Sequence, residues 1–276
     1  MPELPEVETI VRQLKSQVIG KVVQKVEILR PDQWKLNQTD DVEQRLKKQR
    51  IMEITRRAKF ILIEFQSGCR LIIHLRMTGK LIWFPEQVEI DKFTRTVFHF
   101  TDGSSLHYSD TRALGWLIWL ECGEDYPSLS KLGVEPLGDE WNLDHLKSLC
   151  RKSTLEIKHF LMDQNKIAGV GNIYANEILF RSGVHPQRRS NTLSDEEIEK
   201  LFHFIPKILE LAVEKMGTTI GNKVSDYRSI YNIEGGFQNV LAVYGREGQP
   251  CLKCGTPIVR IKQKDRSSFV CEKCQK

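Results

Sequence analysis

The chain lacks any long apolar segment. Its 276 residues contain no run of some 18 apolar residues and no opening stretch of basic residues followed by apolar ones, which are the patterns of a membrane-spanning helix and of a secretory leader. No internal repeat is evident either. With 40% hydrophobic and 28% charged residues, the composition is typical of a soluble globular protein. We therefore expect a cytoplasmic protein of one large or two ordinary domains with no membrane partner.

The chain also has little net charge, and that charge is unevenly placed. The total is +5 at neutral pH. Eight basic and three acidic residues stand between Leu241 and Lys276, against totals of 41 and 36, so the rest of the chain carries 33 of each sign. An excess confined to the end of the chain predicts a polyanionic partner there.

Cysteine is scarce outside the last quarter of the chain. Cys69, Cys122 and Cys150 are scattered, as expected of ordinary buried thiols in a reducing compartment. The other four form two Cys-x2-Cys pairs with sixteen residues between them. This spacing predicts one structural zinc ion held by four thiolates, with no open position for chemistry. The four ligands would be Cys251, Cys254, Cys271 and Cys274.

The residues between the two cysteine pairs indicate a basic hairpin. Residues 259–270 alternate between apolar and polar side chains around a central turn. A hairpin of this length is too short to be stable alone, so the metal would stabilise it. Such a zinc ribbon could contact protein, but the excess positive charge favours nucleic acid.

The first half of the chain indicates a helix followed by a β-rich domain. Apolar residues recur at helical spacing over residues 7–18, and Gly20 ends the pattern. Short strands separated by tight turns then favour an antiparallel sandwich or barrel. The predicted strands are 21–29, 60–65, 70–75, 96–100 and 105–109. We place this first domain at residues 1–133.

The second half of the chain indicates helices. Residues 134–150 form a linker and the start of the helical region, and two amphipathic segments, 155–162 and 173–180, flank a glycine-bearing turn. That pattern favours a relative of the helix-turn-helix, whose backbone amides could meet a phosphate. Ser194 to Glu197 is a capping box for a third helix. We assign residues 151–238 to this helical domain, including a polar loop at 218–238, and residues 239–276 to the finger, which a strand at 240–244 precedes.

The first nine residues carry the most specific chemistry. Start-methionine removal is normally permitted before proline, which would leave the secondary amine of Pro2 at the N-terminus. At pH 7 about a tenth of α-amino groups, but only about one lysine in 2,500, is unprotonated. Such an amine can form a charged iminium with an aldehyde-level carbon, and Glu3 and Glu6 are close enough in sequence to transfer protons. The alternative is a plain helix start, in which early acids complement the helix dipole.

Five motifs, in order over essentially the whole chain, resemble formamidopyrimidine-DNA glycosylases. They are the opening Pro-Glu-Leu-Pro-Glu-Val-Glu-Thr, the run 56–60 (Arg-Arg-Ala-Lys-Phe), the run 74–77 (His-Leu-Arg-Met), the run 169–174 (Gly-Val-Gly-Asn-Ile-Tyr) and the four-cysteine finger. The resemblance implies an α+β protein with an N-terminal β-sandwich, a helix-two-turn-helix domain and a terminal zinc finger. It also implies a monomeric bacterial repair enzyme that acts on oxidised purines and abasic sites in duplex DNA, associated with the nucleoid when bound.

The resemblance implies roles for particular residues. Pro2 would attack the sugar C1′ carbon, Glu3 would protonate the sugar, and Lys59 would assist β-elimination. Arg266 would serve δ-elimination and grip a phosphate. The flipped nucleotide would leave the stack, and residues at the lesion would fill the gap or hold phosphates. The implied DNA-binding set is His74, Met77, Arg95, Arg112, Leu114, Lys152, Lys158 and Asn172.

The chain departs from the family pattern at three positions in this set or beside it. Leu114 stands where an aromatic residue is common, Thr78 where many members carry glutamate, and Arg95 where histidine is frequent. The loop at 218–238 is matched only loosely. These differences bear on base preference more than on the chemistry at Pro2.

Three other functions compete with oxidised-purine repair. A related oxidised-pyrimidine glycosylase is disfavoured because that relative typically begins Pro-Glu-Gly-Pro rather than Pro-Glu-Leu-Pro. A zinc-finger DNA-binding protein without chemistry would explain the tail but would not need Pro2. A tautomerase with an N-terminal proline would explain Pro2 but neither the finger nor the basic tail.

Overall fold

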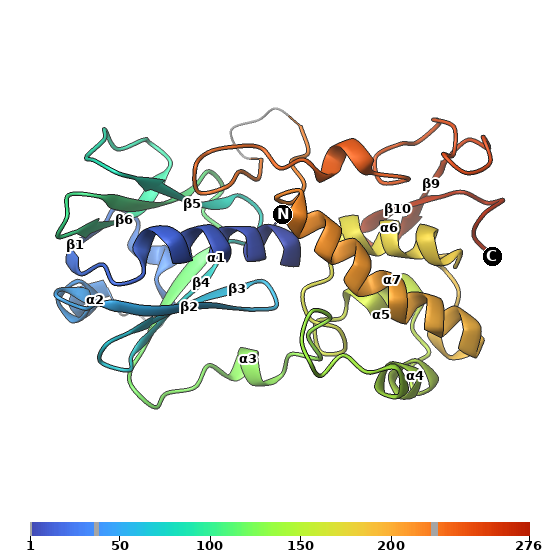
Figure 1. The fold of residues 1–276 in the computed structure, drawn as a ribbon, viewed down its shortest axis with the longest axis horizontal. Coiled ribbons are helices and arrows are strands. Elements are labelled where there is room, and N and C mark those ends of the chain that lie inside the picture. The colour runs from blue at the N-terminus through green and yellow to red at the C-terminus, as the bar shows by residue number, and fades with distance from the viewer. Residues whose placement is uncertain (1, 36–38, 222–225) are drawn as a thin grey trace. The chain divides into compact units, whose positions relative to one another are not determined.

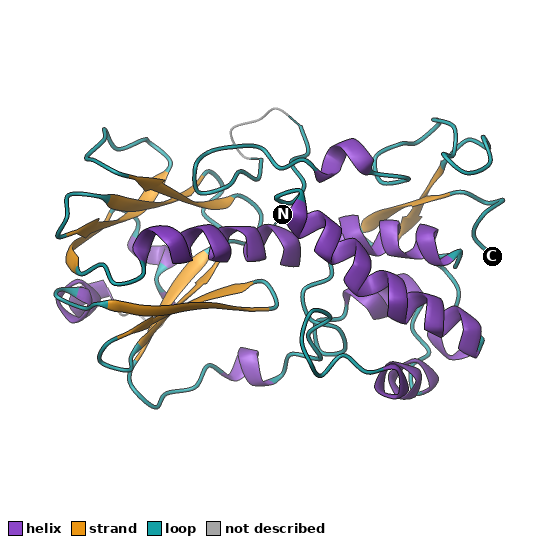
Figure 2. Cartoon of the chain, in the orientation of Figure 1, coloured by secondary structure: helices purple, strands orange, loops and turns teal. Residues whose placement is uncertain are grey.

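The computed structural model describes residues 2–35, 39–221 and 226–276, and the chain folds into two compact units. The first unit comprises Met1–Ser130 and Lys215–Gly236, and the second comprises Lys131–Glu214 and Phe237–Lys276. Helices and strands are both present in each unit (Figures 1 and 2). Among the described residues, no helix is long and apolar enough to cross a membrane.

The first unit, as far as its residues are described, is an antiparallel sandwich of two four-stranded sheets, which confirms the expected fold. One sheet has the order β1-β6-β7-β5 and the other β2-β3-β4-β8. Helix α1 (Leu4–Val18) buries Val7, Ile10 and Leu14 in the core that both sheets share. The bounds are β1 Val23–Ile28, β2 Ile51–Arg57, β3 Phe60–Phe65, β4 Arg70–His74, β5 Gly79–Phe84, β6 Thr94–Phe100, β7 Ser105–Asp110 and β8 Trp116–Leu120, with α2 Thr39–Leu46, α3 Pro127–Ser130 and the 3-10 turn η1 Pro31–Gln33.

The second unit, whose residues 131–214 and 237–276 are all described, holds four helices and the terminal hairpin. Helix α6 begins after the N-cap Gly171 and ends at Gly183, whose left-handed backbone at φ +73° is typical of a helix C-terminus. The strands β9 and β10 pair antiparallel with Arg266 opposite Gln263, which confirms the predicted hairpin. The bounds are α4 Leu143–Arg151, α5 Ile157–Met162, α6 Asn172–Ser182, α7 Asp195–Glu214, β9 Val259–Gln263 and β10 Arg266–Val270, with 3-10 turns η3 Ser190–Thr192 and η4 Phe237–Val240.

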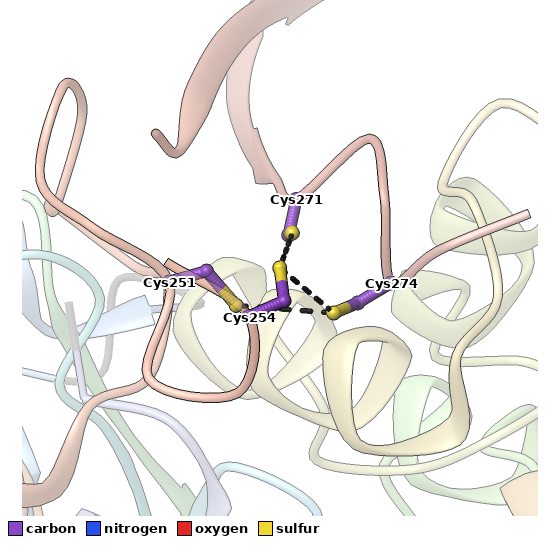
Figure 3. Close-up of side chains that lie close together, drawn as sticks. All are labelled: Cys251, Cys254, Cys271 and Cys274. Carbon is purple, nitrogen blue, oxygen red and sulfur yellow. Dashed lines mark hydrogen bonds between the residues drawn. The ribbon is translucent and has the colours of Figure 1, made fainter. Parts of the chain in front are cut away.

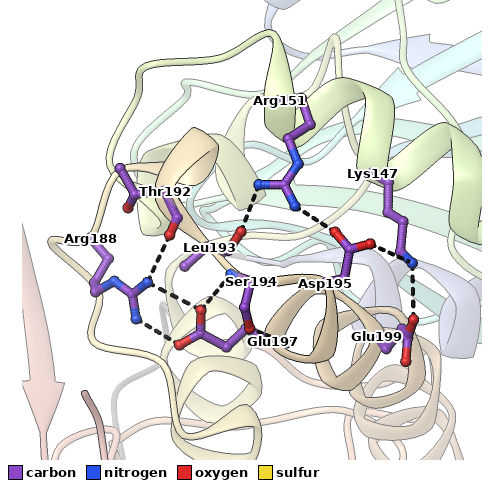
Figure 4. Close-up of polar contacts among 9 residues, drawn as sticks. All are labelled: Lys147, Arg151, Arg188, Thr192, Leu193, Ser194, Asp195, Glu197 and Glu199. Carbon is purple, nitrogen blue, oxygen red and sulfur yellow. Dashed lines mark hydrogen bonds and ion pairs between the residues drawn. The ribbon is translucent and has the colours of Figure 1, made fainter.

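The start of α7 is fixed by the predicted capping box and by ion pairs around it (Figure 4). Ser194 Oγ accepts from the backbone N–H of Glu197 at 3.2 Å, and the Glu197 carboxylate accepts from the Ser194 N–H at 2.8 Å. Arg188 donates to the same carboxylate, and Arg151 and Lys147 of α4 reach Asp195. The acids of the first helical turn thus face cations and the positive end of the helix dipole.

Residues 240–244 were expected to form a strand, and that expectation is wrong. The structure describes all five residues, and they contain no strand. The backbone N–H groups of Ala242, Val243 and Tyr244 all donate to the buried carboxylate of Glu177 on α6, at 2.8–2.9 Å. Because these donors are already occupied, the segment has no row of amides to offer a sheet.

The segment that precedes the finger belongs to the first unit rather than to the helical domain. We grouped the loop at 218–238 with the helical domain, but residues 215–236 fold with the first unit. The N–H of Trp83 in β5 donates to Ile230 O at 3.0 Å, and Gln13 of α1 accepts from Ile230 N at 3.2 Å. Of this predicted loop, residues 222–225 lie outside the described residues.

Candidate functional site

The first turn of α1 holds two buried acids in a capping box. Glu3 is the N-cap, and its side chain accepts from the backbone N–H of Glu6. The Glu6 carboxylate in return accepts from the Glu3 N–H at 2.7 Å. Glu3 and Glu6 are 2% and 1% exposed, and Pro2 beside them is also buried. The helix-start interpretation and the chemical one therefore fall on the same residues.

Glu6 has a second partner that the sequence did not reveal. Its Oε1 atom accepts from the backbone N–H of Thr218 at 2.7 Å, while Oε2 accepts from Glu3. Both carboxylate oxygens therefore hold backbone amides in place. We had expected Glu6 to transfer protons, but this arrangement suits a structural contact better than a proton shuttle.

Lys59 and His74 come together at one end of the sheet β2-β3-β4-β8. Lys59 lies in the turn between β2 and β3, directly before Phe60, and is 9% exposed. Phe60 pairs with His74 across β3 and β4. The turn needs a left-handed residue, Ala58 at φ +51°, and Arg56 donates to its carbonyl at 3.0 Å. Lys59 is therefore buried, and His74, the last residue of β4, is half-buried.

His74 is a neutral histidine. Burial lowers its pKa to about 3, and the positive charges of Arg76 and Lys59 act in the same direction. Nδ1 accepts from the backbone N–H of Arg76 at 3.0 Å, so the ring proton is on Nε2. The ring stacks on Trp116 with centroids 5.5 Å apart. His74 can therefore donate one hydrogen bond through Nε2 without carrying charge.

A buried carboxylate shapes the turn that carries Arg112 and Leu114. Asp110 is fully buried and accepts from the backbone N–H groups of Arg112 and Gly115 at 3.1 and 2.8 Å. Thr78 donates its hydroxyl to the same carboxylate, which links the turn to the residue after Met77. Gln33 and Tyr108 donate to it as well.

Side chains on this turn, and on the turn that contains Met77, are exposed. Arg112 is exposed, Leu114 is 47% exposed and Met77 is 39% exposed. Met77 is therefore not the core filler that its residue type alone would suggest. Thr78 stands where glutamate is common in the family, and here its hydroxyl donates to Asp110. A glutamate at this position would instead put a second carboxylate beside Asp110.

Arg95 supports the same turn from behind. Its Nε donates to the backbone carbonyl of Asp110 at 2.8 Å, and Nη1 donates to Lys92 O at 3.3 Å. The guanidinium is half-buried. In this structure Arg95 braces backbone rather than presenting its full charge to solvent, which weakens the expectation that it is a primary DNA contact.

Asn172 opens α6 directly after the glycine-bearing turn. Gly171, not Asn172, is the N-cap. The Asn172 Oδ1 atom is buried and has no hydrogen-bond partner among the described residues. Oδ1 is an acceptor and would need a donor, so an anion at this end of α6 would bind the Asn172 Nδ2 donor and the backbone N–H groups of the first turn, where the helix dipole also favours negative charge. Lys152, the C-cap of α4, is exposed.

Lys158 is buried rather than available to a phosphate. It is 1% exposed, and its ammonium donates to Ser267 O at 2.7 Å and to Ser268 Oγ at 2.6 Å. We had expected a phosphate ligand, and the structure instead makes Lys158 an anchor for β10. Asn176 of α6 adds a second anchor, because its Oδ1 accepts from the Phe269 N–H at 2.7 Å.

These anchors support Arg266 at the start of β10. Its side chain is 41% exposed and lies 3.8 Å from the carboxylate of Asp265. The adjacent turn residue Lys264 has a left-handed backbone at φ +52°. Arg266 is therefore presented at the tip of a hairpin whose base is held by buried polar contacts.

The four cysteines of the finger converge on one point (Figure 3). Their sulfur atoms all lie within 4.8 Å of one another, and three of the pairs are 3.4–3.9 Å apart. Four ligands at about 2.3 Å in a tetrahedron would be about 3.8 Å apart. The cluster thus fits one four-coordinate metal ion, as the spacing predicted, and Cys251 and Cys271 are buried.

Sequence reasoning missed Asp110, Glu177 and the second contact of Glu6. Glu177 and Glu6 bind partners 65 and 212 residues away, and Asp110 joins its own turn to Gln33 and Thr78, 77 and 32 residues away, so no local pattern signals these roles. Thr78 was the closest clue, since it was noted as a departure from the family.

Comparison with protein-family models matches three consecutive parts of the chain. Residues 1–117 match the formamidopyrimidine-DNA glycosylase N-terminal domain, and residues 132–224 match the H2TH domain of the same glycosylase. Residues 248–276 match a zinc finger found in FPG and IleRS. A formamidopyrimidine-DNA glycosylase of Carboxydothermus hydrogenoformans is 39% identical over all of both chains. One of Lactiplantibacillus plantarum is 40% identical over 98% of each.

Solved structures give the same result. The MutM (Fpg) protein of Thermus thermophilus has a TM-score of 0.89 at 36% identity, covering 99% of this chain and 98% of that one. The Lactococcus lactis Fpg in complex with DNA containing an abasic site has a TM-score of 0.91 at 32% identity, covering 99% of both. A mutant of the latter protein, in complex with DNA containing Fapy-dG, has a TM-score of 0.92 at 32% identity and the same coverage.

Proposed function

The chain belongs to the formamidopyrimidine-DNA glycosylase family, and on that premise we propose that it removes oxidised purines from duplex DNA and then cleaves the strand. The substrates would be 8-oxoguanine, formamidopyrimidines and abasic sites. Relatives have been solved with DNA that contains an abasic site or Fapy-dG, which supports this substrate class.

The observation that carries the proposal is the first turn of α1. After removal of Met1, Pro2 would present a secondary amine directly before two buried acids. The amine would attack C1′ as the bond from C1′ to the base breaks, and the base would leave with the electron pair and take up the proton that the Pro2 nitrogen loses. Glu3 would protonate the sugar ring oxygen, so that the ring opens and an iminium links Pro2 to C1′.

Strand cleavage would follow from the iminium. Loss of a proton from C2′ expels the 3′ phosphate, and a second elimination expels the 5′ phosphate. We assign Lys59 to the first step, beside the neutral His74, and Arg266 to the second. Water would finally release the sugar fragment from Pro2.

The remaining residues would hold the DNA. Asn172 and the N-terminus of α6 would bind a phosphate, together with Lys152, while His74 would donate through Nε2 to another. Met77, Arg112 and Leu114, exposed on neighbouring turns, would fill the gap left by the flipped nucleotide. Arg95 would act mainly through the backbone of Asp110.

We further propose that the metal is zinc and that its role is structural. Four thiolates with no other ligand favour zinc in a closed tetrahedral site, which supplies folding energy to the finger and no step of the reaction. We expect one ion per chain, and a monomeric enzyme acting on DNA in the cytoplasm.

Borohydride trapping tests the proposal. The protein is incubated with a duplex that contains 8-oxoguanine opposite cytosine, and the covalent complex is sought by mass. We expect an adduct for the natural chain and none for a Pro2→Gly variant with one extra residue in front, whereas Pro5→Ala, three residues away, should still form it. Parallel duplexes carry a formamidopyrimidine, an abasic site or an oxidised pyrimidine.

Each result discriminates among the competing functions. A strong preference for the oxidised pyrimidine would favour the related pyrimidine-specific glycosylase. If no duplex gives an adduct while DNA still binds, the protein is a zinc-finger DNA-binding protein without this chemistry.

A further inference from the structure

Glu6 joins two parts of the first unit that are distant in sequence. One oxygen accepts from the N–H of Glu3, the residue after Pro2, and the other accepts from the N–H of Thr218, each at 2.7 Å. Glu6 and Thr218 are 1% and 3% exposed. Charge-assisted bonds of this kind are short and strong when they are shielded from water.

Thr218 lies in the neck of a longer segment. We define the neck as residues 217–219 and 235–236, which lie close to where the chain enters the first unit at Lys215 and leaves it after Gly236. The N–H of Gly236 donates to Lys215 O at 2.7 Å. Thr219 closes the neck from within, because its hydroxyl donates to Tyr227 O at 2.8 Å and accepts from the Gly235 N–H at 2.9 Å.

The two sides of the neck touch backbone to backbone. A Cβ atom on Gly235 would lie 2.3 Å from the Gly217 carbonyl oxygen, a separation that no real side chain has. The neck can therefore form only with glycine at this position, and its shape depends directly on where Gly217 lies.

Gly217 in turn limits the position of the Glu6 carboxylate. Its backbone is left-handed at φ +78°, and an added Cβ would stand 2.8 Å from Glu6 Oε1 and 3.1 Å from the Tyr227 ring. A methyl group there would push the carboxylate away from Thr218. Because Oε2 holds the Glu3 N–H, the same push would reach the first turn of α1.

We propose that Glu6 is a positioning residue that couples the neck to the first turn of α1. The inference rests on the proposed function, since it assigns to Glu6 the orientation of the turn that carries Pro2 and Glu3. A change in the neck alters the Thr218 hydrogen bond, moves the carboxylate and turns the Glu3 backbone. The rate at which Pro2 forms its adduct then depends on residues more than 200 positions away in the sequence.

The test compares Gly217→Ala with a matched control, Gly20→Ala. Gly20 has nearly the same backbone, φ +81°, but a Cβ there would meet nothing within 4 Å, so both variants carry the same strain and only one touches Glu6. The readouts are the single-turnover rate of borohydride-trapped adduct on an abasic-site duplex, and the dissociation constant for that duplex. We expect Gly217→Ala to slow trapping by about tenfold relative to Gly20→Ala, with affinity unchanged.

A double variant separates coupling from general damage. Glu6→Ala removes both side-chain atoms that the new methyl group would strike, Oε1 at 2.8 Å and Cγ at 2.9 Å. If the coupling runs through Glu6, the cost of Gly217→Ala on the trapping rate is smaller in the Glu6→Ala background than in the natural one. An equal cost in both backgrounds, or equal rates for Gly217→Ala and Gly20→Ala, overturns the proposal.

Thr219 provides a second route if Gly217→Ala does not fold. Thr219→Val removes both hydroxyl contacts that close the neck, and Thr219→Ser keeps them. We expect Val to slow trapping and Ser to restore it, and equal rates would overturn the coupling. If the natural chain gives no adduct at all, the proposed function fails. The coupling is then tested by hydrogen exchange of the Glu3 amide. Thr219→Val must accelerate this exchange, and Thr219→Ser must not.

Discussion

The first turn of α1 carries Pro2, which would begin the proposed reaction, and the hairpin β9-β10 carries Arg266, which would assist its second elimination. The two regions are stabilised in different ways. At the first turn, Glu3 and Glu6 cap each other three residues apart, and one further bond reaches Thr218. At the hairpin, the supporting side chains come from much earlier in the chain. Lys158 reaches Ser267 and Ser268, and Asn176 reaches Phe269.

This difference determines how each region responds to change. The reciprocal cap forms with its helix, and a single long-range bond, from the Thr218 N–H, joins the first turn to the rest of the first unit. The hairpin has only two short strands and depends on long-range polar contacts and on a metal. The hairpin is therefore the more fragile of the two, and the following experiments test that comparison.

Removing the metal should have the largest effect. In isolated finger peptides a structural zinc ion supplies about 10–16 kcal/mol of folding free energy. We expect a chelator to increase hydrogen exchange in residues 248–276 strongly while the amides of α1 keep their protection. Hydrogen exchange followed by mass spectrometry makes this measurement. Equal loss of protection in α1 would show that the two regions are not independent.

Lys158→Met should have the next largest effect. The substitution removes the ammonium donor from the half-buried Ser267 carbonyl and from the buried Ser268 hydroxyl, which we expect to cost about 2–4 kcal/mol of unfolding free energy. Lys200→Met, at an exposed position of α7, is the control and should change stability by less than about 0.5 kcal/mol. Urea unfolding of the two variants gives both values, and a small effect at Lys158 would contradict its role as an anchor.

His74 should make the first unit sensitive to acid. Its folded pKa of about 3 lies below the usual 6.5, so the unfolded state binds the proton more readily. The contribution to stability is complete above about pH 6.5 and declines as the pH falls towards 3. Between pH 7 and 5 this group alone should cost about 2 kcal/mol.

Comparison of the natural chain with His74→Gln isolates that loss. The variant should be less sensitive to acid in chemical unfolding at pH 7 and 5, whereas His203→Gln, at an exposed position, should follow the natural chain. Identical pH dependence in His74→Gln would mean that the buried neutral ring does not control acid stability.

Arg266→Ala should give the smallest effect. The side chain is 41% exposed, so its loss should barely change stability but should weaken DNA binding. If Arg266 contacts one phosphate, the slope of log affinity against log salt should fall by about 0.9. An unchanged slope would remove Arg266 from the phosphate contacts and leave the tip of the hairpin without an assigned partner.

Local signals in the sequence predicted most of the fold. Periodicity and turn residues identified strands such as Phe60–Phe65 and the helix at Asn172–Ser182, and spacing alone identified the four cysteines. The capping box at Ser194 was equally local. These features depend on residues a few positions apart, which a sequence displays directly.

Long-range polar contacts account for what the sequence did not predict. Residues 240–244 are of types that favour a strand, but the Glu177 carboxylate binds three of their backbone amides. Lysine is a common phosphate ligand, but the side chain of Lys158 is buried against β10. In each case the partner lies more than 60 residues away, so no window along the chain contains both.

The carboxylate of Asp110 separates the shape of its turn from the surface that the turn presents. Shape depends on buried groups, namely Asp110 and the donors from Thr78, Gln33 and the backbone. The exposed side chains of Arg112 and Leu114 take no part in it. The residue at position 114 can therefore be exchanged without disturbing the buried scaffold, and a designer could place an aromatic ring there without rebuilding the loop.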